Sequence, residues 1–150
     1  MTTTSINKIM TEKLETTEAS SSAQEAAKKM RDKNVSSLVV TDENNTPVGI
    51  VTERDLVRKI CVNDASSRNT LVQDMMSSPL ATIDAISPVE AAADVMIQNK
   101  VRHLLVVENN DIRKPLGIIT LTDFAGYLKE NLNIDDINAK ILESLEENVK

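Results

Sequence analysis

The stretch Gly49-Ile50-Val51-Thr52-Glu53-Arg54-Asp55 decides the fold, because its pattern returns as Gly117-Ile118-Ile119-Thr120-Leu121-Thr122-Asp123. Each copy has a glycine, two β-branched apolar residues, a threonine, two variable positions and an aspartate. A β-branched apolar run that stops at a threonine is typical of a buried strand that ends where a helix begins. The repeat therefore predicts one structural unit that occurs twice.

The similarity between the two copies extends far beyond this motif. An offset of 66 residues pairs Met10 with Met76 and Leu38 with Leu104, and after a two-residue insertion the offset becomes 68. Internal similarity of this length indicates a duplicated unit. The predicted organisation is a first unit at 6–62, a polar linker at 63–71, a second unit at 72–131 and an amphipathic helix at 132–150.

Each unit is predicted to fold as β-α-β-β-α, which places the protein in the α/β class. The first helix of each unit begins at a predicted capping box, Ser22 to Glu25 and Ser87 to Glu90, with Pro88 at the first helical position of the second. Small and apolar residues at helical spacing predict the buried faces of these helices: Ala23, Ala26, Ala27 and Met30, then Val89, Ala92, Ala93, Met96 and Ile97. Apolar runs of strand length predict strands at 14–17, 35–40, 80–83 and 101–107.

The C-terminal segment lies outside the repeat. Its apolar residues recur at helical spacing between acidic positions: Ile134, Ile137, Ile141, Leu145 and Val149. Such a helix either docks on its own domain or forms a dimer contact or a partner-binding tail. Both interpretations stay open at this point.

Composition narrows the functional class. The net charge of -6, from 17 basic and 23 acidic residues, disfavours a nucleic-acid partner. A local basic group would allow an RNA contact, but without stacking aromatics the signal is poor: Lys28, Lys29, Arg31 and Lys33. The single cysteine forms no internal disulfide, no apolar run approaches the ~20 residues of a membrane span, and the N-terminus resembles no targeting segment. We therefore expect a cytoplasmic protein without a membrane segment.

The threonine and aspartate of each motif have two interpretations. Both side chains can cap the helix that follows the strand, which is the simpler interpretation. However, a strand end followed by a helix N-terminus also presents amide hydrogens that favour anions. An aspartate beside it can accept the hydroxyls of a vicinal diol, and a ribose that carries phosphates offers both groups.

The duplicated G-h-h-T-x-x-D motif, each copy within a β-α-β-β-α unit, resembles a tandem pair of cystathionine β-synthase (CBS) domains. The resemblance covers about residues 6–131. It implies two units in a pseudo-twofold arrangement with two clefts, dimerisation, and binding of adenosine-containing ligands such as AMP, ADP or ATP.

The resemblance also implies which residues line the clefts. Asp55 and Asp123 match the family's ribose-binding carboxylates, with Thr52 and Thr120 beside them. Backbone groups are expected to hold adenine near Thr16, Thr17, Val35, Thr82, Ile83 and Val101. Phosphate contacts are expected at Arg102 and His103, with a further hydroxyl from Thr122.

The corresponding positions of the first unit differ in chemistry. Ser36 and Ser37 replace Arg102 and His103, and Arg54 replaces Thr122. The two clefts are therefore expected to be unequal. A solvated strand end is an equally weighted interpretation of Arg102 and His103.

The sequence gives little support for an enzyme. It contains one histidine, one cysteine, no glycine-rich phosphate loop and no cluster spaced like metal ligands. Cys61 lies between Ile60 and Val62 and is expected to pack rather than to react. We expect no required cofactor and no catalytic residue.

Two hypotheses of function follow. In the first, the protein senses an adenine nucleotide, and changes of conformation or assembly carry the signal to a target protein of unknown identity; S-adenosylmethionine or a cyclic dinucleotide is the alternative ligand. In the second, the C-terminal helix docks a protein or macromolecular assembly, and the clefts are mainly structural.

Overall fold

The computed structural model describes residues 4–131 and 134–149. The first unit contains β1 (Thr16–Glu18), α1 (Ala23–Lys33), β2 (Ser37–Thr41), β3 (Pro47–Thr52), α2 (Glu53–Asp55) and the π-helical segment η2 (Leu56–Cys61). The second contains β4 (Thr82–Asp84), α4 (Val89–Asn99), β5 (His103–Glu108), β6 (Asp111–Thr120) and α5 (Leu121–Asn131). Three further helices complete the described chain: η1 (Ile6–Lys8), α3 (Val72–Met75) and α6 (Ile134–Val149).

Each unit is built on its own three-stranded sheet, so the predicted β-α-β-β-α order and the α/β class are confirmed. In both sheets the middle strand pairs in parallel with the first strand and antiparallel with the third. The registers are equivalent, since Ser37 faces Thr52 in one sheet and His103 faces Thr120 in the other. The first two strands of each sheet start about two residues later than their apolar runs predict.

The two first helices begin differently. Ser22 caps α1 as predicted: its hydroxyl accepts from the Glu25 amide at 3.1 Å, and the Glu25 carboxylate accepts from the Ser22 amide at 3.3 Å. The second capping box is wrong, because α4 starts at Val89, Pro88 is the N-cap and no side chain caps the helix. The Thr4 carbonyl instead accepts from the Val89 amide at 3.0 Å.

The buried helix faces follow the predicted spacing except at one position. Ala26 and Met30 of α1 and Ala92 and Met96 of α4 are buried, whereas Ile97, predicted on the same face, is 75% exposed. Ile97 corresponds to the exposed Arg31 of α1 in the repeat. The buried stripe therefore ends one position earlier than its apolar sequence predicts.

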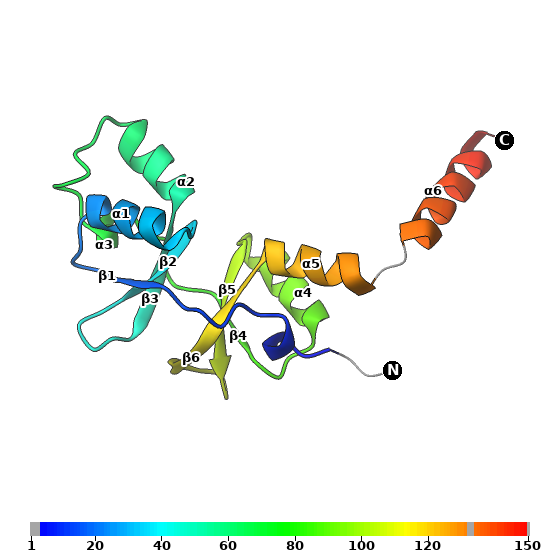
Figure 1. Cartoon of the computed structure of the whole chain (residues 1–150), viewed down its shortest axis with the longest axis horizontal. Helices are drawn as coiled ribbons and strands as arrows, with labels where there is room; N and C mark the ends of the chain where they lie inside the picture. The colour runs from blue at the N-terminus through cyan, green and yellow to red at the C-terminus, as the bar shows by residue number, and fades with distance from the viewer. Residues whose placement is uncertain (1–3, 132–133, 150) are drawn as a thin grey trace.

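The first segment of each repeat packs into the core of the other repeat. Ile6 of η1 lies with the core of the second unit, and Val72 and Met75 of α3 lie with the core of the first. Figure 1 shows η1 beside α4, and the Ile6 amide donates to the carbonyl of Ser87 at 2.9 Å. The boundaries predicted from the repeat do not describe this exchange.

Gly49 and Gly117 allow these exchanged segments to approach the sheets. A Cβ on Gly49 would lie 2.7 Å from the Ser77 carbonyl oxygen, and one on Gly117 would lie 2.5 Å from that of Thr11. The backbone of Ile50 pairs with Ser77, and that of Ile118 pairs with Thr11. The glycine that opens each repeated motif is therefore required by close backbone contact.

A third apolar cluster joins the two sheets. It contains Val39 of β2, Leu105 and Val107 of β5, and Leu80. Beyond it, α5 has no buried residue, and Figure 1 shows α6 standing clear of both units. Among the described residues, no helix is long and apolar enough to cross a membrane.

Candidate functional site

The threonine and aspartate of each repeated motif cap the helix that follows. The carboxylate of Asp55 accepts from the Thr52 amide at 2.9 Å, and the Thr52 hydroxyl accepts from the Asp55 amide at 3.2 Å. Thr120 and Asp123 make the same pair of bonds at 3.0 and 3.3 Å. The capping interpretation is thus confirmed, and it holds each aspartate by Oδ2 while Oδ1 points elsewhere.

The first cleft, here the Asp55 cleft, has a volume of about 500 Å³ and is formed by both units. The first unit contributes Ser36, Ile50, Thr52, Glu53, Arg54 and Asp55. The second contributes Ser77, Pro79, Leu80, Ala81, Lys100, Val101, Arg102 and His103. Two carboxylates of the first unit, Glu53 and Asp55, therefore line the same cavity as Lys100 and Arg102 of the second unit.

The second cleft, here the Thr120 cleft, is smaller, at about 230 Å³. Its lining comes mostly from the first unit: Thr11, Lys13, Leu14, Glu15, Asn34, Val35, Ser36, Ser37 and Val39, with Ile118 and Thr120 from the second. Beside it, the Thr11 hydroxyl donates to Oδ1 of Asp123 at 3.1 Å. Both oxygens of the Asp123 carboxylate therefore already accept hydrogen bonds within the protein.

Asp55 has a different second partner. The Lys59 ammonium lies 3.5 Å from Oδ1 of Asp55 and also donates to the Met75 carbonyl at 2.6 Å. Lys59 is thereby held one helical turn beyond Asp55 by the exchanged α3. Oδ1 of Asp55 therefore lies beside a cation, whereas Oδ1 of Asp123 accepts a hydroxyl hydrogen from Thr11.

His103 lies at the start of β5, directly across from Thr120. Burial lowers the pKa of His103 below its ordinary value of 6.5, and the positive charge of Arg102 lowers it further. Asp123 and Asp55 act in the opposite direction but do not reverse the shift. A neutral imidazole therefore lies close to the carboxylates of both motifs.

The structure distributes the predicted site residues over both clefts. The Asp55 cleft brings together Ser36, Thr52, Arg54, Asp55, Val101, Arg102 and His103. The Thr120 cleft contains Val35, Ser36, Ser37 and Thr120. Asp123, predicted to bind a ribose, lies outside the lining of both clefts, as do Thr16, Thr17, Thr82, Ile83 and Thr122. Thr17 and Ile83 are buried.

The sequence did not indicate several residues that line the clefts. Lys100 ends α4 in the left-handed conformation, with φ of 55°, and thereby reaches the Asp55 cleft. Thr11 and Lys13 reach the Thr120 cleft because the first segment crosses to the second unit. The repeat aligns Thr11 with Ser77, which indicates that both segments have equivalent places in the fold. The alignment does not reveal which of the two units each segment contacts.

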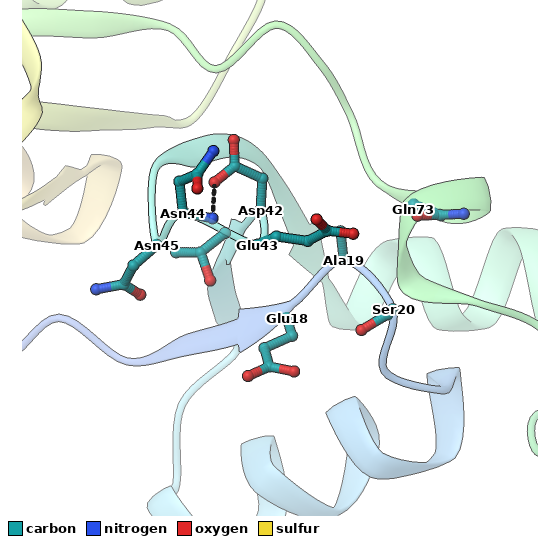
Figure 2. Close-up of a pocket in the computed structure, with 9 residues that line it drawn as sticks. Glu18, Ala19, Ser20, Asp42, Glu43, Asn44, Asn45 and Gln73 are labelled. Atoms are coloured by element: carbon teal, nitrogen blue, oxygen red, sulfur yellow. Dashed lines mark hydrogen bonds between the residues drawn. The ribbon is translucent and has the colours of Figure 1, made fainter.

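A further cavity of about 600 Å³ lies apart from these clefts. Figure 2 shows its lining from the end of β1, the loop between β2 and β3, and α3: Glu18, Ala19, Ser20, Asp42, Glu43, Asn44, Asn45 and Gln73. Thr41 at the end of β2 completes the lining. The Asp42 carboxylate accepts from the amides of Asn44 and Thr46 at 2.9 Å, which shapes the loop. None of the predicted site residues lies there.

The described residues show no clustered metal ligands, since no three His, Cys, Asp or Glu side chains among them form a group that could hold an ion. The packing expected for Cys61 is wrong, because its side chain is exposed on η2 while Ile60 is buried. Ile60 packs in the core of the first unit, and the next residue along the helix, Cys61, faces solvent.

Comparison with known proteins gives consistent matches. The chain is 36% identical over 101 residues to an uncharacterized protein of Methanopyrus kandleri. The aligned segment makes up 67% of this chain but only 50% of that protein. A crystal structure of an uncharacterized conserved protein from Pyrococcus horikoshii superimposes with a TM-score of 0.76 at 29% identity, covering 87% of this chain and 96% of that one.

A second solved structure is the CBS domain pair of protein MJ0100 in complex with 5′-methylthioadenosine and S-adenosyl-L-methionine. It has a TM-score of 0.76 at 24% identity and covers 87% of this chain and all of that one (100%). The family model described as CBS domain matches residues 6–61 and 72–130. These two matched segments together span most of the chain, and the protein therefore belongs to the CBS-domain family.

Proposed function

We propose that this protein is a regulatory module that binds an adenosine-containing nucleotide of the AMP, ADP or ATP class in the Asp55 cleft. One observation carries the proposal: a single cavity combines the capped carboxylate of Asp55 with Lys100, Arg102 and His103 of the other unit. The Asp55 carboxylate and the cations Lys100 and Arg102 are the two functions that recognise a ribose phosphate.

Asp55 would bind the ribose. Its Oδ2 atom is fixed by the helix cap, and Oδ1, 3.5 Å from the Lys59 ammonium, would accept the ribose hydroxyl hydrogens. A hydrogen bond to a charged group contributes about 1.5–3 kcal/mol, or roughly a tenfold to hundredfold change in affinity. Loss of this carboxylate should therefore be easily measured in a binding experiment.

The phosphates would lie toward the second unit. Lys100 and Arg102 supply fixed positive charge, and Arg54 of α2 lines the same cavity. His103 is neutral in the free protein, and an adjacent phosphate would favour its protonated form. This part of the cleft would distinguish a nucleotide from an uncharged nucleoside.

The base would contact aliphatic walls, because the described residues that line the cleft include no Phe, Tyr or Trp. Apolar lining is supplied by Ile50, Pro79, Leu80, Ala81 and Val101. S-adenosylmethionine and cyclic dinucleotides are alternative ligands of the same cleft, and the S-adenosyl-L-methionine complex of the MJ0100 CBS pair supports keeping the first in the test.

Ligand binding would carry a signal because the cleft is formed by both units. A ligand that contacts Asp55 and Arg102 together stabilises one relative arrangement of the units, and its effect is limited by its differential affinity for the arrangements. The conformational change would be transmitted within a homodimer to a target protein. The module itself would be non-catalytic.

A second candidate function is favoured by α6. Its side chains at Ile141, Leu142 and Leu145 are 53–61% exposed. An exposed apolar face on a helix marks an interaction site. In this case the protein acts as an interaction module, and the clefts contribute only to structure.

Isothermal titration calorimetry with AMP, ADP, ATP, S-adenosylmethionine and a cyclic dinucleotide tests the first proposal. Asp55→Asn should weaken binding of the preferred ligand at least tenfold, while Asp123→Asn, its equivalent in the other motif, should change it little. Binding of none of these ligands would overturn the sensor function. Equal effects of the two substitutions would overturn the assignment to the Asp55 cleft.

A further inference from the structure

The fold leaves two valines exposed at η2: Val57 within it and Val62 directly after it. Val57 is 55% exposed and Val62 is 72% exposed. The Val62 amide donates to the Val57 carbonyl at 3.0 Å, a bond across five residues that is the hallmark of a π-helical turn. The two valines therefore lie about one helical turn apart, and Arg58 and Cys61 between them are also exposed. We call these four residues the η2 surface.

The second repeat has no equivalent of this surface. The repeat aligns Val57 with Ala125 and Val62 with Glu130, both exposed on α5. A small residue and a charged one replace the two valines. The apolar pair therefore distinguishes the first unit from its duplicate, although the two helices have the same place in the fold.

A second exposed apolar surface belongs to α6. Every side chain from 138 to 148 is exposed, and Ile141, Leu142 and Leu145 gather within one turn of the helix. Figure 1 shows this helix separated from the two units. An isolated amphipathic helix of 16 residues gains most of its stability from packing of its apolar face, so this face requires a partner.

Charge favours a pairing between these two surfaces. The sequence of α6 contains five acidic residues and one lysine, whereas Arg58 is exposed and has no ion pair among the described residues. Ile97 of α4 is similarly exposed, but Glu90 and Asp94 lie on the same helix face and would repel an acidic helix. The η2 surface is the better match.

We propose that α6 of one copy packs against the η2 surface of a second copy, so that two chains exchange their C-terminal helices. The occupant comes from a second copy because α6 begins three residues after α5 ends, and Figure 1 places it at the opposite end of the molecule from α2. A twofold-symmetric pair forms this contact twice. The inference does not depend on the nucleotide proposal, since the η2 surface contains no residue of the Asp55 cleft.

The single cysteine of the chain makes the contact directly testable, because Cys61 lies on the η2 surface. In Leu145→Cys, mild oxidation of the full-length protein should link position 145 of one chain to Cys61 of another. Mixing isotopically labelled and unlabelled chains before oxidation identifies by mass spectrometry whether the linked peptides come from two chains. Glu147→Cys, on the opposite face of α6, is the matched control and should give at least tenfold less of this product.

Substitutions provide the second arm. Val57→Asp should raise the dimer dissociation constant measured by analytical ultracentrifugation at least tenfold, while Ala125→Asp at the equivalent position of α5 should change it less than twofold. The proposal is overturned if position 145 links to Cys61 within one chain, or to position 145 of another chain. It is also overturned if the two cysteine variants crosslink equally or the two aspartate variants dimerise equally.

Discussion

The hydroxyl of Thr11 donates to Oδ1 of Asp123 at 3.1 Å, whereas Ser77, the equivalent of Thr11 in the repeat, has no such bond to Asp55 among the described side chains. The first segment of the chain thus occupies the carboxylate oxygen that would bind a ribose beside the Thr120 cleft. The two clefts therefore differ in size and also in whether the aspartate of their motif has an oxygen that is open to a ribose hydroxyl.

We therefore expect one equivalent of nucleotide per chain for the unmodified protein. Thr11→Val removes the competing donor at nearly constant volume, and a second, weaker equivalent should appear in calorimetric titrations. Ser77→Ala is the matched control and should leave the stoichiometry at one. Two equal sites before substitution, or no second site in Thr11→Val, would contradict the role given to Thr11.

The glycines of the repeated motif should be intolerant of a side chain. Gly117→Ala places a Cβ 2.5 Å from the Thr11 carbonyl oxygen, and the resulting displacement should cost about 1–3 kcal/mol in the free energy of unfolding. Gly126→Ala, which meets no atom within 4 Å on α5, should instead stabilise the protein by about 1 kcal/mol. Urea denaturation measures both, and equal effects of the two substitutions would show that close backbone contact is unimportant.

Titration of His103 should report on the cleft. Its folded pKa lies below 6.5, so between these two values the unfolded chain binds more protons than the folded one. The contribution of His103 to stability should therefore be complete above pH 6.5 and decline as pH falls toward the folded pKa. His103 is the only histidine, so its imidazole NMR signal follows the titration without overlap.

Nucleotide binding should reverse this shift. A phosphate near His103 favours the imidazolium, so saturation with the preferred nucleotide should raise the pKa seen by NMR, and affinity should increase as pH falls from 7.5 to 6. His103→Gln should remove that pH dependence. A pKa that is unchanged by bound nucleotide would place the phosphates elsewhere.

The two first helices should respond differently to loss of serine. Ser22→Ala removes a capping hydroxyl and should cost about 1 kcal/mol in the free energy of unfolding. Ser87→Ala should be nearly neutral, because α4 is capped by a backbone carbonyl instead. Similar losses for both would contradict the asymmetry between these helix starts.

The sequence predicted the elements well because local patterns encode them. The G-h-h-T-x-x-D repeat marks both β3–α2 and β6–α5, and Ser22 with Glu25 marks the start of α1. The prediction was wrong where a segment distant in sequence makes the contact. The Thr4 carbonyl, not the predicted Ser87 side chain, caps the start of α4.

The candidate site was predictable only in part for the same reason. Asp55 and Arg102 are each visible in the repeat, but their position across one cavity depends on how the two units pack. Lys100 escaped notice because its approach depends on the left-handed end of α4. Periodicity carries no information on contacts between units.

The exchange of η1 and α3 between the cores has a consequence for folding. A fragment cut at the repeat boundary, residues 6–62, would lack Val72 and Met75 and leave a gap in its core, while carrying an unpaired Ile6. A fragment of residues 12–77 would instead contain the complete first core. The second core has no such continuous fragment, because it combines Ile6 with residues beyond 80, so it should form only once the N-terminal segment has docked on it.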